Sequence, residues 1–342
     1  MSTWKNGLPV GYSARPVKME DLEACVAMIN AAFRELKGVE MFTLEEFAPD
    51  LQVPGFNLET DTRLVIAPDG EIAAYYEAWD LLEPSVRVNL WGHTHPAHRN
   101  VGIGTYLLGW AEERAEKAVE RAPEGARVVI QANIPTINPA AGELFANSGY
   151  RLIRHSLRMV IDLNGTPLKP QWPAGITVST FKAVGDLVKV VRAVRGAFRD
   201  HWGYVEVPFE VEFERWKHRT EKNPDFDPSL WFLAMDGEEI AGISLCRLKI
   251  YDDPEMGWVD TLGVQRPWRR KGLGLALLHH SFRALYKLSK QRVGLGVDAQ
   301  SLTGATRLYQ KAGMRPDPSR QYDLYEKELR PGVELSTQVV QA

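Results

Sequence analysis

Two short segments of this sequence combine basic residues with closely spaced glycines, a composition suited to binding an anion. Residues 99–104 read Arg-Asn-Val-Gly-Ile-Gly, and residues 269–274 read Arg-Arg-Lys-Gly-Leu-Gly. Each segment follows a run of strand-forming residues and precedes a run with helical spacing. Backbone N–H groups at the start of a helix attract anions, and glycines let the anion approach closely. We therefore expect a phosphate or pyrophosphate group to bind at these segments.

The residue types assign a role to each position of the two segments. The expected binding residues are Arg269, Arg270, Lys271, Gly272, Leu273 and Gly274 in the second segment and Arg99, Gly102 and Gly104 in the first. Backbone N–H groups would contact the anion, and the basic side chains would add positive charge. The alternative interpretation is a tight turn whose glycines serve only to let helices pack.

Two better-known phosphate-binding loops do not fit these segments. A dinucleotide fingerprint needs a third glycine three residues further on, where Leu107 and Leu277 stand. A Walker loop needs a lysine directly after a glycine, whereas Lys271 precedes Gly272. The sequence therefore predicts a different kind of anion-binding loop.

The two segments belong to a longer internal repeat. Matching features lie 164 to 170 positions apart and in the same order: Phe33 with Phe198, Gly70 with Gly237, Gly102 with Gly272, and Gly149 with Gly313. This period is far longer than that of a solenoid, so the repeated unit is a whole domain. We predict one domain over residues 1–163 and a second over 175–330, joined by a linker rich in proline and glycine. Residues 331–342 are expected to form an extension or a disordered end.

Both copies show the same order of predicted elements. A short strand and an amphipathic helix come first, and an Asp-Gly hairpin follows. A further strand then leads into the Gly-rich segment, where a helix begins, and a strand, a helix and a final strand complete the copy. The predicted central strands cover residues 63–67, 72–78 and 86–91 in the first copy and 230–235, 240–248 and 257–264 in the second. The mixture predicts an α+β fold, with a mixed, mostly antiparallel sheet flanked by helices in each domain.

Both copies resemble the GNAT superfamily of acetyltransferases, whose pattern is Arg/Gln-x-x-Gly-x-Gly/Ala. The resemblance covers nearly the whole chain, twice. Residues 262–268 are similar to the family's strand before the pyrophosphate loop, whose backbone pairs with the pantetheine arm of coenzyme A. The resemblance therefore implies acetyl-coenzyme A as cosubstrate and adds Leu262 and Val264 to its binding residues. The tandem arrangement is similar to that of mycothiol synthase.

The resemblance also implies a catalytic acid in the second copy. The family has a tyrosine in Ala-x-x-Leu-Tyr-x-x-x-Gly-Phe, and residues 305–314 match this pattern with Tyr309 in place. Its hydroxyl would protonate the departing thiolate. The first copy has Phe145 there, and a phenyl ring cannot donate a proton. We therefore expect a degenerate N-terminal domain and a catalytic C-terminal domain; the alternative makes Tyr309 a core residue only.

No base is fixed by the sequence. Asp260 lies on the strand entering the second Gly-rich segment and Asp298 at the end of the next strand, so either is a candidate. The alternative for each is a solvated or ion-paired carboxylate without a catalytic role. Glu255 is a weaker candidate for the base. The aromatic segment 198–204 lies where the family builds its acceptor wall, although packing alone would also explain its rings.

Composition limits the partners. The chain has 342 residues, a net charge of −3 and 44% hydrophobic residues, so we expect neither a nucleic acid nor a membrane partner.

Its two cysteines, Cys25 and Cys246, favour a reducing compartment. Residues 1–10 lack a signal-peptide pattern and no apolar run is long enough to span a bilayer, so we expect a cytoplasmic protein. A histidine cluster, His93 to His98, lacks a further ligand nearby, and no metal is expected.

The predicted function is N-acetyl transfer from acetyl-coenzyme A to a small-molecule or peptide amine, by direct attack in the second domain of a monomer or homodimer. A thiol-pathway enzyme like mycothiol synthase is a second reading with a different acceptor. A third, from another class, is a coenzyme A-binding sensor or scaffold without turnover. The sequence does not identify the acceptor.

Overall fold

The computed structural model describes residues 7–339, and it divides the chain into two compact units. Unit 1 comprises Met1–Arg154 and Tyr322–Leu335, and unit 2 comprises His155–Gln321 and Ser336–Ala342. Residues 1–6, which make up most of the segment without a signal-peptide pattern, lie outside the described residues, as do residues 340–342 of the predicted tail.

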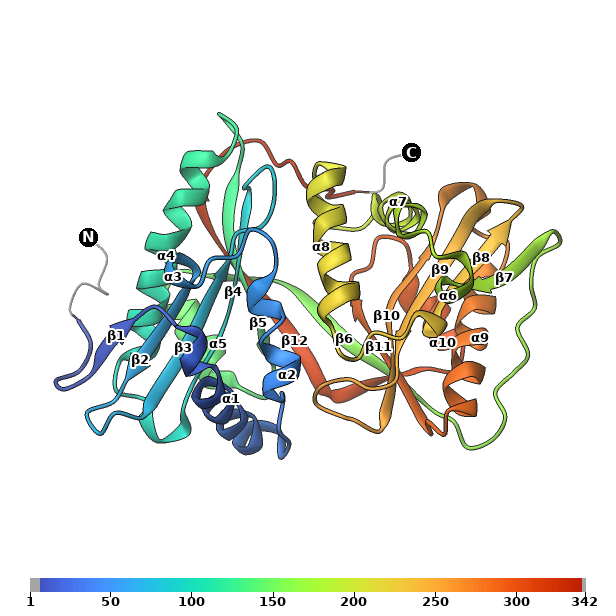
Figure 1. Ribbon diagram of the computed structural model, residues 1–342. Coiled ribbons are helices and arrows are strands. Elements are labelled where there is room, and N and C mark those ends of the chain that lie inside the picture. Colours follow the sequence, from blue (N-terminus) through green and yellow to red (C-terminus); the bar gives the residue numbers. More distant parts are fainter. Residues whose placement is uncertain (1–6, 340–342) are drawn as a thin grey trace. The chain divides into compact units, whose positions relative to one another are not determined.

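Unit 1 is a six-stranded sheet in the order β1-β2-β3-β4-β5-β12, antiparallel except between β4 and β5 (Figure 1). Its elements are β1 (Ser13–Arg15), η2 (Met19–Asp21), α1 (Leu22–Lys37), α2 (Leu44–Phe47), η3 (Asp50–Gln52), α3 (Leu58–Asp61), β2 (Thr62–Ile66), β3 (Ile72–Trp79), β4 (Arg87–Thr94), η4 (Pro96–His98), α4 (Ile103–Arg121), β5 (Val128–Pro135), α5 (Pro139–Asn147) and the later part of β12 (Arg315–Arg330).

Unit 2 repeats this sheet in the order β7-β8-β9-β10-β11-β6, antiparallel except between β10 and β11. Its elements are the later part of β6 (Arg151–Asp162), β7 (Ile176–Thr180), α6 (Phe181–Val184), α7 (Leu187–Phe198), α8 (Phe209–Lys222), η5 (Pro228–Leu230), β8 (Trp231–Asp236), β9 (Glu239–Arg247), β10 (Met256–Val264), η6 (Arg266–Trp268), α9 (Leu273–Lys287), β11 (Arg292–Asp298), α10 (Ala305–Lys311) and the first part of β12.

The two copies exchange their closing strands. The sequence predicts that each copy ends in a strand of its own sheet, but β6 pairs with β11 of unit 2 and β12 pairs with β5 of unit 1. Both closing strands cover an edge that would otherwise expose unpaired backbone groups, and either strand satisfies that requirement. The units therefore differ from the predicted ranges 1–163 and 175–330 at their ends.

Helices cover both faces of each sheet. In unit 1 the neighbouring strand residues Tyr75 and Tyr76 point to opposite faces, where they join the cores beneath α1 and α4 respectively. In unit 2, Leu233 packs beneath α7 and Phe232 beneath α9 in the same way. Successive strand side chains point to opposite faces of the sheet, so each sheet packs against helices on both faces and forms the middle of three layers. The predicted fold, two tandem domains with mostly antiparallel sheets flanked by helices, is confirmed.

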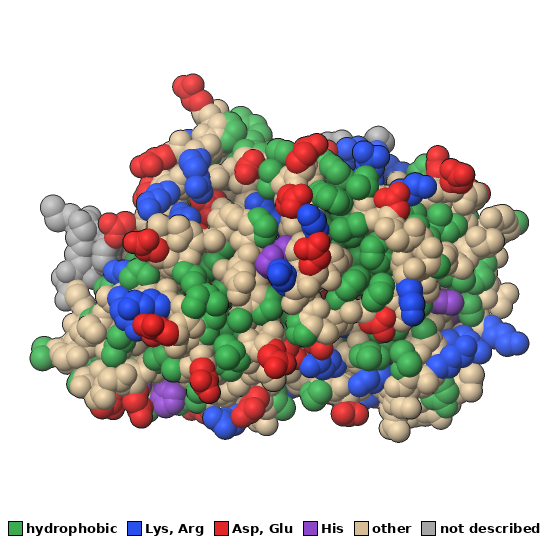
Figure 2. Space-filling view, in the orientation of Figure 1, with side chains coloured by type: hydrophobic (Ala, Val, Ile, Leu, Met, Phe, Trp, Pro, Cys, Tyr) green, Lys and Arg blue, Asp and Glu red, His purple; other side chains and the backbone are tan. Residues whose placement is uncertain are grey.

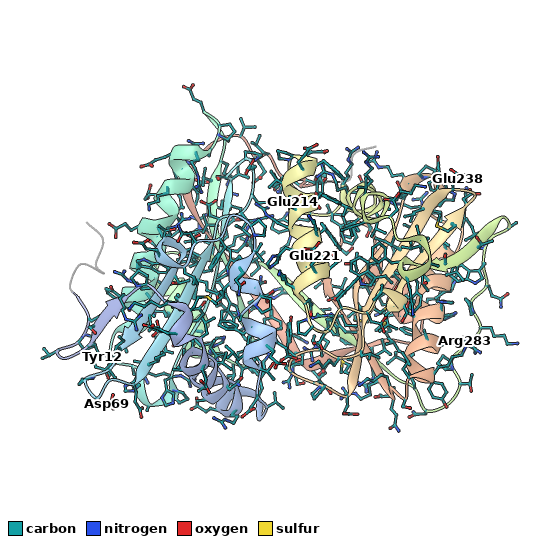
Figure 3. The ribbon with its side chains drawn as sticks, viewed as in Figure 1. Tyr12, Asp69, Glu214, Glu221, Glu238 and Arg283 are labelled. Atoms are coloured by element: carbon teal, nitrogen blue, oxygen red, sulfur yellow. The ribbon has the colours of Figure 1, made fainter. Side chains whose placement is uncertain are left out.

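The predicted Asp-Gly hairpins are also confirmed. They join β2 to β3 and β8 to β9, and Gly70 and Gly237 occupy the left-handed region with φ of 90° and 59°. Asp69 and Glu238 mark the two exposed turns in Figure 3. The turns fix the register within each pair of strands, and β9 pairs in turn with β10.

The surface has charges of both signs. In the view of Figure 2, Lys and Arg side chains are interspersed with Asp and Glu. Within residues 7–339, no helix has both the length and the apolar composition that crossing a membrane requires.

Candidate active site

The second Gly-rich segment forms a turn between β10 and α9. Arg270 and Gly272 take left-handed conformations, with φ of 63° and 84°, and Gly272 caps the helix that begins at Leu273. A Cβ on Gly272 would meet nothing within 4 Å, so the turn leaves open space in front of its backbone. The first turn of an α-helix has N–H groups without partners inside the helix, and they are therefore available to an anion.

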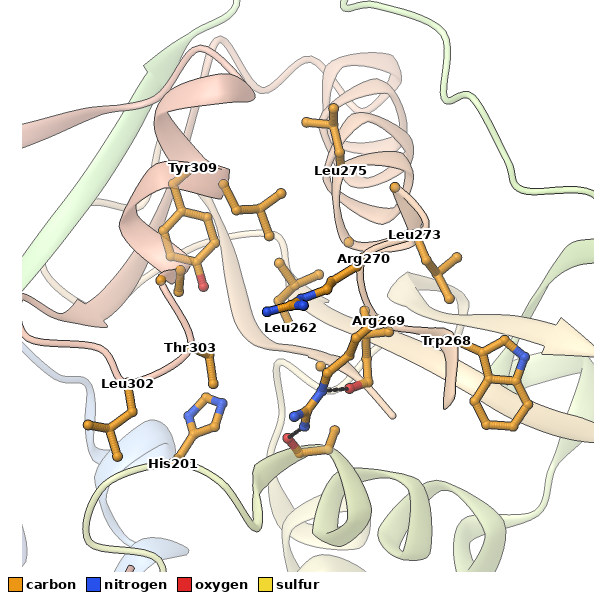
Figure 4. A pocket seen from close by; sticks show the side chains of 18 residues that line it. His201, Leu262, Trp268, Arg269, Arg270, Leu273, Leu275, Leu302, Thr303 and Tyr309 are labelled. Carbon is orange, nitrogen blue, oxygen red and sulfur yellow. Dashed lines mark hydrogen bonds between the residues drawn. The ribbon is translucent and has the colours of Figure 1, made fainter. Parts of the chain in front are cut away.

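This turn opens onto a cleft of about 420 Å³. The walls come from the end of β10, the start of α9, residues 302–309, and the end of α7 with the loop that follows it (Figure 4). The predicted residues that line it are Leu262, Val264, Arg269, Arg270, Gly272, Leu273, Gly274 and Tyr309. Lys271 is exposed and is not among the lining residues. Leucine side chains make part of the wall apolar, which suits an extended thiol-bearing arm beside an anion site.

The Arg269 side chain lines the cleft and is also bonded to groups of the protein itself. Its guanidinium donates to the Asp200 carboxylate, to the Val264 carbonyl at 3.0 Å and to the Ala197 carbonyl at 2.9 Å. Arg266 donates to the same carboxylate, which is 1% exposed. Hydrogen bonds from Arg266 and Arg269 lower the pKa of Asp200 to about 2 although burial opposes them. Arg269 therefore ties the turn to α7, an arrangement that the sequence does not show.

Arg270 is the basic residue whose side chain extends into the cavity in Figure 4. Within residues 7–339 it has neither a hydrogen bond nor an ion pair. A guanidinium in this position has donors available for a phosphate, which it matches in geometry.

Tyr309 lies on α10 and its residue is 7% exposed. Burial raises the pKa of its hydroxyl to about 12, so it stays protonated at neutral pH. In Figure 4 the hydroxyl points into the cleft. The side chain is therefore both part of a hydrophobic core and available as a proton donor.

The two predicted base candidates do not line the cleft. Asp260 is the extra residue of a β-bulge between Val259 and Thr261, and both of its carboxylate oxygens bind Arg247 at 2.6 and 2.7 Å. Asp298 accepts a hydrogen bond from the Gln300 backbone N–H at 2.8 Å. For Asp260, the alternative prediction of an ion-paired carboxylate matches the structure.

His201 does line the cleft, in the loop directly after α7. Burial, followed by the positive charge of Arg269, lowers the pKa of its ring below the usual value, although Asp200 and Asp298 act in the opposite direction. The sequence predicts an aromatic wall over residues 198–204 and no separate role for His201.

The predicted tail helps to hold this loop. Thr337 exchanges backbone hydrogen bonds with Gly203 and Tyr204, both 2.8 Å long, and its hydroxyl donates to the Arg199 carbonyl at 3.0 Å. The described part of the tail therefore contacts the loop after α7 through Thr337.

Comparisons with known proteins agree with this geometry. The acetyltransferase (GNAT) family matches residues 194–314, which lie in unit 2. A GCN5-related N-acetyltransferase from Sphaerobacter thermophilus is 36% identical, with 97% of this chain and 100% of that chain covered and a TM-score of 0.77. The mycothiol acetyltransferase of Thermobispora bispora is 28% identical over 302 residues, covering 86% of this chain and 92% of the relative. The chain belongs to the GNAT family. It is thus an acyltransferase.

A tandem GNAT protein from the clavulanic acid biosynthesis pathway has the same fold. It is 16% identical, with a TM-score of 0.68 over 94% of this chain and 100% of that chain. At this identity the likeness concerns architecture alone, and it matches the two-unit organisation of this GNAT protein.

The first GNAT unit differs from the second at several positions of the site. Phe145 replaces Tyr309 and packs against Tyr150 with ring centroids 4.9 Å apart. The β3–β4 ladder runs without a bulge, and Leu90 stands 170 positions before Asp260. A cavity of about 150 Å³ is lined by Phe145 and other aromatic residues but not by the Gly-rich turn.

The first Gly-rich turn nevertheless keeps its shape. Gly102 caps α4 with φ of 94°, and Arg99 forms an ion pair with Glu35. Glu35 lies 165 positions before Asp200, so both GNAT units hold the arginine of the motif with an acidic residue near the end of their first long helix. A Cβ on Gly104 would meet Leu144 at 2.7 Å, just as Gly274 faces Leu308, so this glycine serves helix packing in both units.

The histidine cluster of the first unit consists of separate contacts. His93 packs against Phe33 and Trp91, His95 accepts the Ala97 N–H at 3.3 Å, and His98 bonds the Tyr12 hydroxyl at 2.9 Å. In the part of the chain that the structure describes, no group of three or more His, Cys, Asp or Glu residues is arranged to hold a metal ion.

Proposed function

We propose that this GNAT protein transfers an acetyl group from acetyl-coenzyme A to a small-molecule amine by direct attack, and that unit 2 carries out the reaction. The observation that carries the proposal is the single cleft onto which both the Gly-rich turn and the Tyr309 hydroxyl open. Unit 1 has Phe145 in place of that hydroxyl. Under this proposal, unit 2 supplies both the binding site and the proton donor.

The residues of the cleft fit the parts of acetyl-coenzyme A. The amides that begin α9 and the Arg270 guanidinium would hold the pyrophosphate. The backbone of Leu262 and Val264 would pair with the pantetheine arm, because β10 separates from β11 after the Trp258–Gly294 pair. Lys271 would contribute its backbone N–H and long-range charge rather than a wall of the cleft.

Direct attack is favoured over a route through an acylated cysteine. Cys25 and Cys246 are buried, and burial raises the pKa of each thiol to about 12. Neither thiol would form the thiolate needed for nucleophilic attack near neutral pH, and neither lines the cleft.

The relatives favour a small acceptor. Curated relatives at 27–30% identity are named mycothiol acetyltransferase, a name that concerns a small thiol rather than a protein. The test is a panel of amino sugars, amino acids, polyamines and aromatic amines, assayed for acetyl-coenzyme A-dependent thiol release and for the acetylated product. A sensor or scaffold would bind acetyl-coenzyme A without turnover for any member.

Gly272→Val is expected to weaken acetyl-coenzyme A binding at least tenfold. The side chain would occupy the open space in front of the turn, at a φ that L-residues rarely adopt, and would remove one or two charge-assisted hydrogen bonds worth about 1.5–3 kcal/mol each. Isothermal titration calorimetry gives the dissociation constant.

Gly237→Val is the matched control, because Gly237 also has a positive φ and open space but lies in the β8–β9 turn. It carries the same kind of backbone strain outside the cleft. Equal affinities for the two variants would contradict the assignment of the second Gly-rich turn.

Disrupting the first Gly-rich turn should spare turnover. Arg99→Ala combined with Gly102→Val removes the ion pair with Glu35 and strains the cap of α4. We expect kcat within about twofold of wild type, since Phe145 leaves unit 1 without a proton donor. Circular dichroism confirms that the variant is folded, and a loss of activity as large as that of Gly272→Val would show that unit 1 also takes part.

A further inference from the structure

We propose that His201 is the general base that takes a proton from the acceptor ammonium in unit 2, an inference that rests on the proposed function. His201 and Tyr309 line the same cleft. Figure 4 shows the imidazole projecting into it from the loop after α7, on the side of Thr303 and Tyr309. A base and an acid for one transfer are thereby brought to one cavity.

The internal repeat supports this role independently. Residues 32–35 read Ala-Phe-Arg-Glu and residues 197–200 read Ala-Phe-Arg-Asp, at a constant offset of 165. The next residue is Leu36 in the first copy and His201 in the second. By sequence offset, the copy that has Phe145 for Tyr309 therefore has Leu36 for His201; Leu36 lies within α1, whereas His201 follows α7.

The loop that carries His201 is held at several points. The residue before it, Asp200, binds Arg266 and Arg269. Thr337 pairs with the backbone of Gly203 and Tyr204. The His201 ring packs against Phe198 with centroids 4.3 Å apart. Among residues 7–339 no group bonds to either ring nitrogen, so both remain available to a substrate.

The surroundings of the His201 ring favour its unprotonated form, which can accept a proton. Arg269, from the turn before α9, and burial both lower the pKa of His201, while Asp200 from its own loop and Asp298 from the end of β11 raise it. The net shift is downward, so the imidazole is neutral near pH 7. By contrast, both carboxylate oxygens of Asp260 are bound to Arg247.

The proposed step is balanced. His201 takes one proton from the acceptor ammonium, and the freed amine nitrogen bonds to the acetyl carbonyl carbon. The carbon–sulfur bond breaks with its electron pair on sulfur, to which Tyr309 gives its proton. The nitrogen loses a second proton as the amide forms, which restores Tyr309 by way of solvent, and His201 releases its own proton to solvent.

His201→Gln tests the proposal, with acetyl-coenzyme A and the best acceptor of the amine panel. We expect kcat/KM to fall about 10²-fold, the lower end of a general-base contribution. The wild-type profile should lose activity as pH falls through a pKa below the usual 6.5, and this acidic limb should be absent from the variant. Added imidazole should restore part of the activity of His201→Ala.

His280→Gln is the control, because His280 packs against Trp172 and Phe232 and does not line the cleft. It should keep the wild-type rate and profile. A His201→Gln variant with an intact acidic limb, or a His201→Ala variant that imidazole does not rescue, would overturn the base role while leaving acetyl transfer standing. A wild-type protein that acetylates no amine of the panel would overturn the proposed function and this inference together.

Discussion

Tyr309→Phe should lower kcat about 10²-fold, the lower end of a general-acid contribution. The phenolic proton is lost while the ring still fills its place in the core of unit 2. Affinity for acetyl-coenzyme A should change little, because the Gly-rich turn is untouched. The variant reproduces in unit 2 what Phe145 already does in unit 1. Steady-state rates and calorimetry on one preparation separate the two effects.

The control for this variant is Tyr286→Phe. Tyr286 packs against the same core as Tyr309 but does not line the cleft. The Tyr286→Phe variant therefore loses a hydroxyl that lies outside the cleft. Its kcat should match that of wild type. If a folded Tyr309→Phe protein also kept that rate, Tyr309 would be a core residue, and the main reason for locating catalysis in unit 2 would be gone.

The features predicted from sequence are those with local patterns. The hairpin glycines, the Gly-rich turns and the apolar periodicity of the strands each depend on neighbouring residues, so a short window is enough to recognise them. The repeat strengthens each pattern, because Gly102 and Gly272 are found in the same context. Tyr309 was identified through a family pattern, and its place in the cleft follows from that pattern.

Other features depend on contacts that a sequence window does not contain. Either closing strand can pair with either sheet, so spacing alone could not reveal the exchange of β6 and β12. Asp200 lies 69 positions before Arg269, and nothing local marks them as partners. The polar tail has no periodic pattern, and its backbone hydrogen bonds to residues 203–204 join segments that are far apart in the sequence.

The pairing of Asp200 with Arg266 and Arg269 should have a measurable effect on stability. Its folded pKa of about 2 lies below the unfolded value of about 3.9, so ionisation favours the folded state. This stabilisation is fully present above pH ~4 and is lost as pH falls towards 2. At neutral pH the difference corresponds to about 2–3 kcal/mol.

Asp200→Asn should therefore lower the free energy of unfolding of unit 2 by about 2–3 kcal/mol at pH 7, and by about half as much at pH 3. Asp162→Asn is the matched control: Asp162 also pairs with two arginines, Arg292 and Arg315, but its side chain is 38% exposed against 1% for Asp200. Solvent screens that pair, so its loss should cost less than about 1 kcal/mol. Urea unfolding of both variants at the two pH values measures the difference.

Equal losses of unfolding free energy for the two variants at pH 7 would mean that burial of Asp200 offsets what its two arginines contribute. The same would follow from a loss for Asp200→Asn that does not shrink in acid. The Gly-rich turn would then depend on the Arg269 bonds to the Val264 and Ala197 carbonyls for its position.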